Sequence, residues 1–335
     1  MGGNALSFET KRCTKAEFNS IAHTVSWNLD HKHMLVPAYF SKDSFGDMDV
    51  VVEVNDLFEM KRLVENIKEK FAPKEIVRNG PVISFDVEDF QIDFITVPSS
   101  QFKFAVNYFA WNDLGNFIGR TAHRLGFKCG HAGLKYVLRD SQDDTRVVAE
   151  LYLTQSTREA LNFLDFDVNT FLDGFDTPEE IFDYASSSSY FDPATFVLAN
   201  RNHTARVRDR KRKMYNACVE HYKQKFAVTD ESVPAEIDKS VHLQRALETF
   251  PAFKVAYDNA LAEHALNKAF KANFNGHTIG AMFNLEGKEL GAKMKEFREF
   301  IDANKLKEFI ASLPTVEFFN FVMMMNKLII AKIKV

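Results

Sequence analysis

Two short apolar runs of the chain carry three aspartates between them, and this pattern constrains the fold more than any other feature. The first run is DMDVVVEV, residues 47–54, and the second is FQIDFITV, residues 90–97. Side chains alternate along a strand, so Asp47 and Asp49 share a face, about 7 Å apart. Both runs are short, apolar and β-branched, which predicts strands. If the strands are neighbours, Asp93 joins the other two, and three carboxylates converge.

The flanking residues predict a compact α+β unit around these strands. Thr14-Lys15-Ala16-Glu17 is a capping-box pattern and predicts a helix start near Thr14. Residues 56–71 have apolar side chains at helical spacing. The pair Glu88-Asp89 separates two strand-like runs and predicts a tight hairpin turn. We therefore expect a mixed β-sheet with flanking helices, followed by a mostly α-helical C-terminal domain.

Further signals set the expected domain boundaries. Residues 107–127 read mainly as one helix, and Thr177 caps a short helix that precedes a run of four serines. That run and Pro193 suggest a boundary near 185–200. We expect the sheet unit over residues 1–130, a second segment over 131–195 and a helical domain over 196–335.

Carboxylates gathered in this way require a counter-charge, because like charges at close range raise one another's pKa. Mg²⁺ prefers hard oxygen ligands and is held by a few carboxylates together with substrate phosphates. Two such ions can clamp the attacking and leaving oxygens of an in-line displacement. Taken singly, each aspartate is better explained as an ordinary strand acid. The pair Asp47 and Asp49 combined with Asp93 on a later strand favours a metal site.

Three motifs in order resemble the DNA polymerase X family, whose best-known member is DNA polymerase β. GDMDVVV is similar to the family's first acidic strand. IDFITVPSSQFKFAVNYF matches, without a gap, the segment that runs from the third metal-binding Asp to a Tyr-Phe pair. TPEEIFDYASSSSYFDP is similar to the end of the family's thumb. The resemblance covers residues 34–193, about half of the chain.

The resemblance implies a nucleotidyltransferase palm that uses two Mg²⁺ or Mn²⁺ ions. Asp47 and Asp49 would bind both ions, and Asp93 would bind the catalytic ion and orient the attacking 3′-hydroxyl. These three residues are the expected catalytic and metal-binding set. The other positions that match contacts to the incoming nucleotide, or to the template beside it, are Tyr108, Phe109, Asp113, Asn116 and Arg120.

The segment before the first strand departs from the family. Ala38-Tyr39 stands where family members carry a Gly-Ser pair that binds the β,γ-phosphates. Two serine hydroxyls and one lysine ammonium group lie nearby in the sequence and would bind the phosphates instead. The expected phosphate-binding residues are Ser41, Lys42, Ser44 and Gly46. The palm begins near residue 34, which leaves no room before it for the family's lyase and helix-hairpin-helix modules.

Residues 201–225 form a basic segment with nine Lys or Arg against two acids. On a single helix, Arg206, Arg210 and Lys213 would share one face. Such a strip is either a solvated face or a phosphate-binding surface for nucleic acid, and composition does not separate the two. GKELG, near residue 289, faintly resembles a turn in tRNA CCA-adding enzymes and poly(A) polymerases.

Composition and charge narrow the setting of the protein. The net charge of −4 argues against a general nucleic-acid binder, so any such site is a local patch. Cys13, Cys129 and Cys218 show no paired spacing, which favours a reducing compartment such as the cytoplasm. No signal peptide or myristoylation pattern opens the chain. The apolar tail is interrupted by polar residues, and no membrane segment is expected.

These observations predict transfer of a nucleotide from NTP or dNTP to the 3′-hydroxyl of a nucleic acid. End addition or repair of tRNA, RNA or DNA is favoured over extended templated synthesis, because the DNA-gripping modules are missing. Two alternatives stay open. The acceptor could be a protein or a small molecule, or the site could be a decayed remnant in a binding protein.

Overall fold

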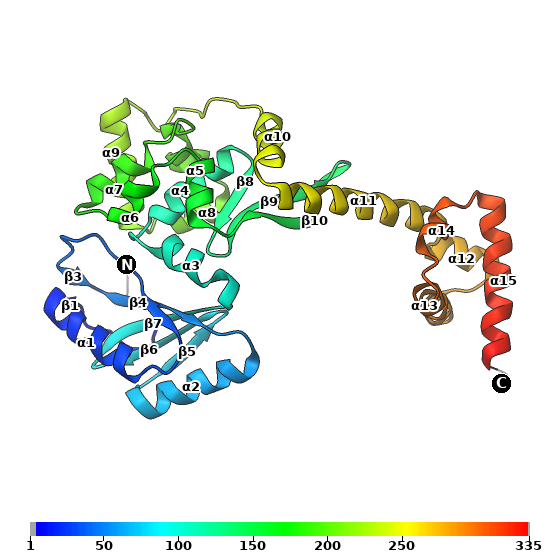
Figure 1. Cartoon of the computed structure of the whole chain (residues 1–335), viewed down its shortest axis with the longest axis horizontal. Coiled ribbons are helices and arrows are strands. Elements are labelled where there is room, and N and C mark those ends of the chain that lie inside the picture. Colours follow the sequence, from blue (N-terminus) through cyan, green and yellow to red (C-terminus); the bar gives the residue numbers. More distant parts are fainter. Residues whose placement is uncertain (1–4, 334–335) are drawn as a thin grey trace. The chain divides into compact units, whose positions relative to one another are not determined.

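The structure is a computed structural model that describes residues 5–333 of the chain (Figure 1). Contacts divide it into two compact units. The first comprises the chain up to Leu138 together with Glu150–Phe253, and the second comprises Arg139–Ala149 and the chain from Lys254 onward. This division differs from the expected segments, because most of 131–195 and the part of 196–335 up to Phe253 pack into the first unit.

A mixed five-stranded sheet forms the centre of the first unit, in the order β2-β4-β7-β6-β5. β4 and β7 are parallel, and every other neighbouring pair is antiparallel. The sheet is therefore mixed, as expected. Its strands are β2 (His33–Leu35), β4 (Asp47–Glu53), β5 (Ile76–Asn79), β6 (Val82–Val87) and β7 (Phe90–Val97).

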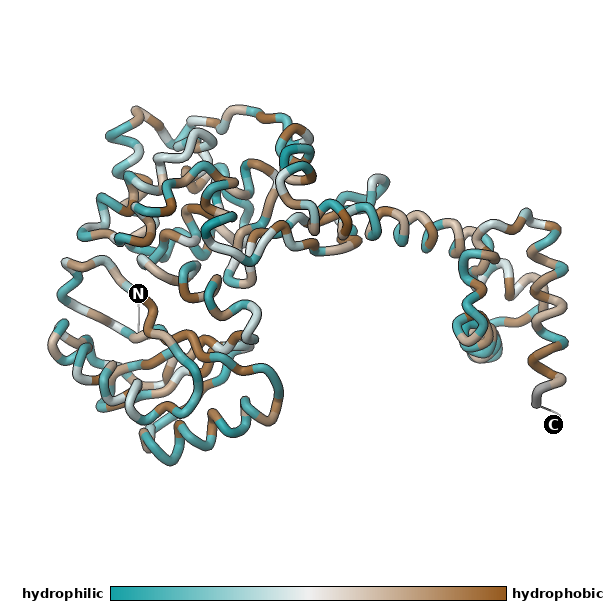
Figure 2. The backbone as a smooth tube through the Cα atoms, in the orientation of Figure 1, coloured by the Kyte–Doolittle hydropathy of each residue, from teal (hydrophilic) through white to brown (hydrophobic). Residues whose placement is uncertain are grey.

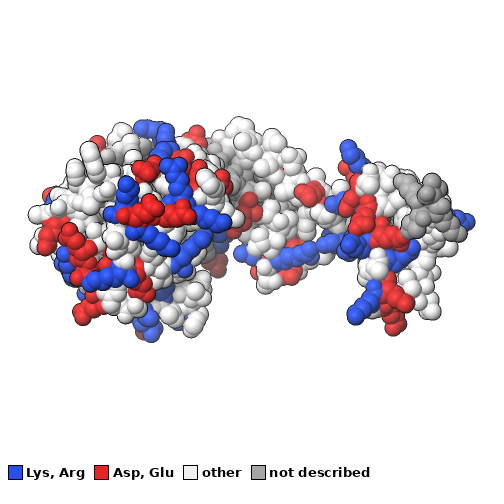
Figure 3. Space-filling model, turned by 90° about the horizontal axis from the view of Figure 1, so that it is seen from below, with Lys and Arg blue, Asp and Glu red and all other residues white. Residues whose placement is uncertain are grey.

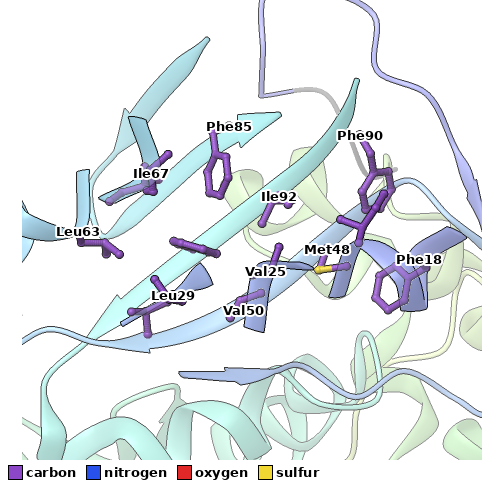
Figure 4. Packing of buried hydrophobic residues seen from close by; sticks show 14 of the residues in the cluster. Phe18, Val25, Leu29, Met48, Val50, Leu63, Ile67, Phe85, Phe90 and Ile92 are labelled. Carbon is purple, nitrogen blue, oxygen red and sulfur yellow. The ribbon is translucent and has the colours of Figure 1, made fainter. Parts of the chain in front are cut away.

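One face of this sheet is covered by α1 (Lys15–Asn28) and α2 (Leu57–Phe71), which pack onto a buried apolar core. Figure 4 shows Met48 and Val50 of β4 close to Val25 of α1, and Leu63 and Ile67 of α2 belong to the same core. α3 (Phe102–Phe109), preceded by η1 (Ser99–Gln101), covers the opposite face. The alternation expected along β4 is therefore confirmed.

The predicted helix caps and hairpin around the sheet are confirmed. Thr14 and Glu17 form a reciprocal capping box at the start of α1. The backbones of Glu88 and Asp89 both have positive φ, 51° and 66°, as a two-residue hairpin turn requires. A short pair of strands, β1 (Cys13–Thr14) and β3 (Ser44–Phe45), joins the start of α1 to the segment before β4.

The segment 107–127 is mainly helical and ends just before Gly126, as predicted, but it is divided into the end of α3 and α4 (Leu114–Arg124). Trp111 and Asn112 interrupt it with positive φ values of 60° and 61°. The amide of Trp111 donates to the carbonyl of Pro37 at 2.8 Å instead of continuing the helix. A tertiary contact therefore replaces a helical hydrogen bond at this position.

The rest of the first unit comprises β8, most of β9, the end of β10 from Glu150 and then mainly helices, and the strand residues between Arg139 and Ala149 belong to the second unit. The short helix expected after Thr177 is confirmed as α7, with the Thr177 side chain as its cap. The remaining elements are β8 (Phe127–Gly130), β9 (Gly133–Asp140), β10 (Asp143–Thr154), α5 (Thr157–Phe163), α6 (Val168–Asp173), α7 (Pro178–Ala185), η2 (Pro193–Phe196), η3 (Leu198–Asn200), α8 (His203–Asp209), α9 (Lys213–Phe226) and α10 (Lys239–Thr249).

The second unit is helical apart from the strand residues between Arg139 and Ala149. Its helices enclose a core that includes Phe297 and Phe318. Polar residues interrupt the apolar runs of α15 (Figure 2), and no helix of the described residues is long and apolar enough to cross a membrane. The helices are α11 (Pro251–Asn273), α12 (Gly276–Phe283), α13 (Gly287–Ala303), α14 (Lys307–Ser312) and α15 (Thr315–Ile333).

Candidate active site

The three aspartates lie on two neighbouring strands. β4 and β7 are hydrogen-bonded partners, and Asp49 pairs with Asp93 while Asp47 pairs with Gln91. Paired residues on neighbouring strands point to the same face, and neighbouring strands lie about 4.8 Å apart. Asp47, Asp49 and Asp93 therefore share one face of the sheet, on the side covered further along by α3. The adjacency expected from the sequence is confirmed.

Asp93 is held in place by polar neighbours on β7 and β6. The buried side-chain amide of Gln91 donates from Nε2 to both carboxylate oxygens of Asp93, at 2.9 and 3.0 Å. The carbonyl oxygen of the same side chain accepts from the amide of Ala5 at 2.9 Å, which fixes its orientation. On the other side, Ser84 of β6 pairs directly with Asp93. The carboxylate is thus oriented by the protein.

The aspartates perturb one another's protonation. Desolvation, followed by the charges of Asp47 and Asp93, raises the pKa of Asp49 to about 7. Its side chain nevertheless reaches solvent. Burial also raises the pKa of Asp93, although hydrogen bonds from Ser84 and Gln91 oppose that rise. At neutral pH the site therefore carries negative charge that favours either a proton or a cation.

Two cationic side chains stand beside these acids. Burial lowers the pKa of the Lys42 ammonium group, while the charges of Asp47 and Asp49 oppose that change. Arg12 donates from Nε to the hydroxyl of Ser44 at 3.0 Å and from Nη2 to its carbonyl at 3.1 Å. Both cations can attract a phosphate toward the acidic face, since they lie on the segments that lead into β1 and β4.

The donor set suits a hard divalent cation, although it is not a closed cage. No group of three or more His, Cys, Asp or Glu side chains within residues 5–333 has the spacing to hold a metal ion by itself. Mg²⁺ is commonly held by one or two carboxylates, with waters and substrate phosphates completing its shell. Asp49 and Asp93, opposite one another with raised pKa values, meet that requirement. Ion binding there would also relieve their repulsion.

The segment before β4 is fastened to the chain between α6 and α7. The amide of Phe40 donates to the carbonyl of Phe175 at 2.9 Å, and the amide of Ser41 donates to that of Asp176 at 3.0 Å. The hydroxyl of Ser41 donates to the same Asp176 carbonyl at 2.5 Å. We call residues 37–42 with 174–177 the strap. In this conformation Ser41 is engaged within the strap and is not free for a phosphate.

The Tyr-Phe pair expected under the nucleotide sugar lies at the end of α3. The rings of Tyr108 and Phe109 meet edge to face at 5.2 Å, and Phe109 also stacks on His131 at 5.9 Å. A Cβ atom at Gly115 would lie 2.0 Å from the carbonyl oxygen of Tyr108. Because only glycine permits this approach, α3 and α4 are in direct backbone contact at the pair.

The expected nucleotide contacts on α4 face arginines of the basic segment. Arg212 donates to the carboxylate of Asp113 at 2.5 Å, and Arg208 donates to the side-chain oxygen of Asn116 at 3.3 Å. The amide nitrogen of Asn116 is buried and has no hydrogen-bond partner among the described residues. Arg120 lines a cavity whose walls include none of the three aspartates. These α4 residues thus belong to a more basic environment than the sheet.

The strip predicted on a single helix over residues 201–225 is wrong in its geometry. α8 ends at Asp209 and α9 begins at Lys213, so Arg206, Arg210 and Lys213 are not on one helix. Between the helices the amide of Arg212 donates to the carbonyl of Asp209 at 3.0 Å. The Asp209 carboxylate is fully buried and accepts hydrogen bonds from Arg201 and Arg208.

Three residues at the site were not expected from the sequence. Ser84 could have been found, because a two-residue turn at 88–89 fixes the register that places it opposite Asp93. Gln91 carries a weaker signal, since it shares a strand face with Asp93. Arg12 reaches Ser44 only through the β1–β3 pairing, which no sequence pattern indicates.

Comparison of the chain with protein-family models and with curated proteins finds no match in either. A function is therefore inferred from the residues and their geometry.

Proposed function

We propose that this chain is a Mg²⁺-dependent nucleotidyltransferase of the DNA polymerase X type, with the β4–β7 unit as its palm. The supporting observation is the register that sets Asp49 opposite Asp93 on parallel strands, with Asp47 two residues earlier on the same face. The raised pKa values of Asp49 and Asp93 support a site built to receive a cation.

In this proposal each residue has a defined task. Asp47 and Asp49 would hold Mg²⁺ or Mn²⁺, and the ion would supply the positive charge that the nucleotide phosphates require. Asp93, oriented by Gln91, positions the acceptor hydroxyl. The bond formed would join that oxygen to the α-phosphorus, the hydroxyl proton would pass to the adjacent Asp93 carboxylate or to water, and pyrophosphate would leave with the electron pair of the broken bond. Catalysis arises mainly from positioning and charge stabilisation.

The nucleotide itself would lie between the acidic face and the end of α3. Lys42 is close enough to Asp47 and Asp49 to interact with both, so it is the best placed of the expected phosphate-binding residues. Tyr108 and Phe109 would support the sugar. Ser41 would contribute only after release from the strap, because its hydroxyl is already donating.

The acceptor is proposed to be the 3′-hydroxyl of a nucleic acid, because arginines on α8 and α9 adjoin the expected nucleotide-binding helix α4. A protein or small-molecule acceptor would use the same aspartates without those arginines. A decayed site would bind neither metal nor nucleotide.

The proposal is tested by incubating the protein with Mg²⁺ and labelled nucleotides in the presence of tRNA, single-stranded RNA, single-stranded DNA or gapped DNA. We expect label transfer to at least one acceptor and loss of transfer in Asp49→Asn. Glu53→Gln is the matched control, because this acid lies on the same strand and pairs with Lys32 instead. Absence of transfer to every acceptor, together with no nucleotide binding in Mg²⁺, would refute the enzymatic proposal.

A further inference from the structure

A second site is suggested by a cavity of about 950 Å³ in the first unit. Its walls come from the end of α4, the residues from η3 to α8, and the segment 234–239 that leads into α10. Cavities that bind small ligands span roughly 300–1,000 Å³, so this one is large enough for a ligand of nucleotide size.

The lining of this cavity is strongly basic. Its charged residues are Arg120, Arg124, Arg201, Arg208, Lys239 and a single acid, Glu236. Two carboxylates that do not line the cavity compensate part of this charge. Asp192 pairs with Arg124 at 3.3 Å, and Asp209 pairs with both Arg201 and Arg208 at 2.9 and 2.8 Å. Five cations against three carboxylates leave two positive charges in surplus.

Hydrogen-bond donors in the wall are also left unused. The Nε atoms of Arg120 and Arg124 are buried and have no partner within the described part of the chain. A buried donor without an acceptor is unfavourable, and an anion in the cavity is one way to supply the acceptor. Lys239 forms no salt bridge or side-chain hydrogen bond with any residue between 5 and 333. It is therefore available to a ligand.

The basic character is local to the cavity. The face in Figure 3 shows lysines and arginines interspersed with acids, and the chain as a whole has a net charge of −4. The lining includes no Phe, Tyr or Trp, so it offers no platform on which a base could stack. Guanidinium groups bind phosphate oxygens through paired N–H donors, which fits this lining better than recognition of a base.

We propose that this cavity is a binding site for closely spaced phosphate groups, separate from the aspartates of the sheet. The phosphates could belong to a nucleic-acid strand or to a free polyphosphorylated molecule, since both present the same oxyanions. The site requires no metal and no catalysis, so it stands or falls independently of the proposed transfer reaction.

The test measures binding in EDTA, which removes any contribution that depends on divalent ions at the aspartates. Inorganic tripolyphosphate is titrated by calorimetry, and a labelled single-stranded oligonucleotide is followed by fluorescence anisotropy at low and high salt. We expect at least one probe to bind. The affinity should fall about fivefold in Lys239→Gln and about tenfold in Arg208→Gln, because each variant removes a charged donor.

Arg62→Gln is the control, because it removes the same charge from an exposed position on α2. If Arg208→Gln fails to fold through loss of its contact with Asp209, the exposed Lys239→Gln still decides the question. Tripolyphosphate binding that weakens only in the cavity variants supports a free polyphosphate, and oligonucleotide binding that does so supports a strand. The proposal is overturned if neither probe binds, or if Lys239→Gln binds as tightly as Arg62→Gln.

Discussion

The acidic strands and the strap meet at the candidate active site but are held in different ways. Asp49 and Asp93 are fixed by the hydrogen bonds of a central parallel strand pair and by a buried core beneath. Ser41 and Phe40 are fixed by carbonyl groups some 135 residues further along the chain. The acidic face is thus built into the sheet, whereas the phosphate side of the site depends on hydrogen bonds between segments far apart in the chain. Substitutions on the acidic face should therefore mainly reduce activity, and substitutions in the strap should mainly reduce stability.

The largest effect is expected for Asp93→Asn on catalysis. The substitution keeps the shape of the side chain and removes the charge, so the transfer rate should fall by about 1,000-fold or more. Measured by label transfer under saturating nucleotide, Glu53→Gln should stay within about twofold of the unchanged protein, since exposed ion pairs contribute little. Equal activity in Asp93→Asn and Glu53→Gln would show that the acidic face takes no part in the reaction.

The strap is expected to dominate stability at the site. Trp111 is buried and packs edge to face on Phe40 and Phe175, with ring centroids 5.6 Å apart in each case. Trp111→Ala should lower the free energy of unfolding by about 3–5 kcal/mol, as measured by urea denaturation. Trp27, which is 82% exposed, provides the control, and Trp27→Ala should change stability by less than about 0.5 kcal/mol. A similar loss in both variants would show that the strap is not anchored by this ring.

The pH dependence distinguishes the acidic face from the strap. The pKa of Asp49 is raised to about 7 in the folded chain, above its ordinary value. The folded state therefore binds the extra proton, and this stabilising contribution is lost as pH rises toward and through 7. Urea midpoints between pH 4.5 and 8 should show a smaller loss in Asp49→Asn than in the unchanged protein. An identical pH profile in both would mean that Asp49 is not perturbed.

Mg²⁺ should reverse this trend at the same residue. Because the ion competes with the proton, the thermal stabilisation by Mg²⁺ should grow as pH rises through about 7 and should vanish in Asp49→Asn. Thermal shift measurements at pH 6 and 8 provide the comparison. A shift that is independent of pH would place the ion elsewhere.

The smallest effect is expected for Ser41→Ala. The hydroxyl donates to the Asp176 carbonyl, and its removal should cost about 1 kcal/mol of unfolding free energy. The KM for nucleotide should not change if the strap stays closed during turnover. A large rise in KM with unchanged stability would instead show that the strap opens and that Ser41 binds phosphate.

The sequence predicts the acidic face well because its signals are local. Alternation along β4 and β7 identifies the faces, and the turn at Glu88-Asp89 sets the hairpin register. The strap is not predictable in this way, because it joins segments far apart in the chain. The interruption at Trp111 has the same origin, since its amide gives up a helical hydrogen bond for the carbonyl of Pro37.

The contact at Gly115 has a mechanical consequence. With the Tyr108 carbonyl 2.0 Å from where a Cβ atom would stand, the junction accepts hydrogen and no larger group. The two helices cannot slide past one another without collision, so they should move as a single rigid body. If α8 and α9 moved and α4 moved with them, Tyr108 and Phe109 on α3 would then shift by a similar amount.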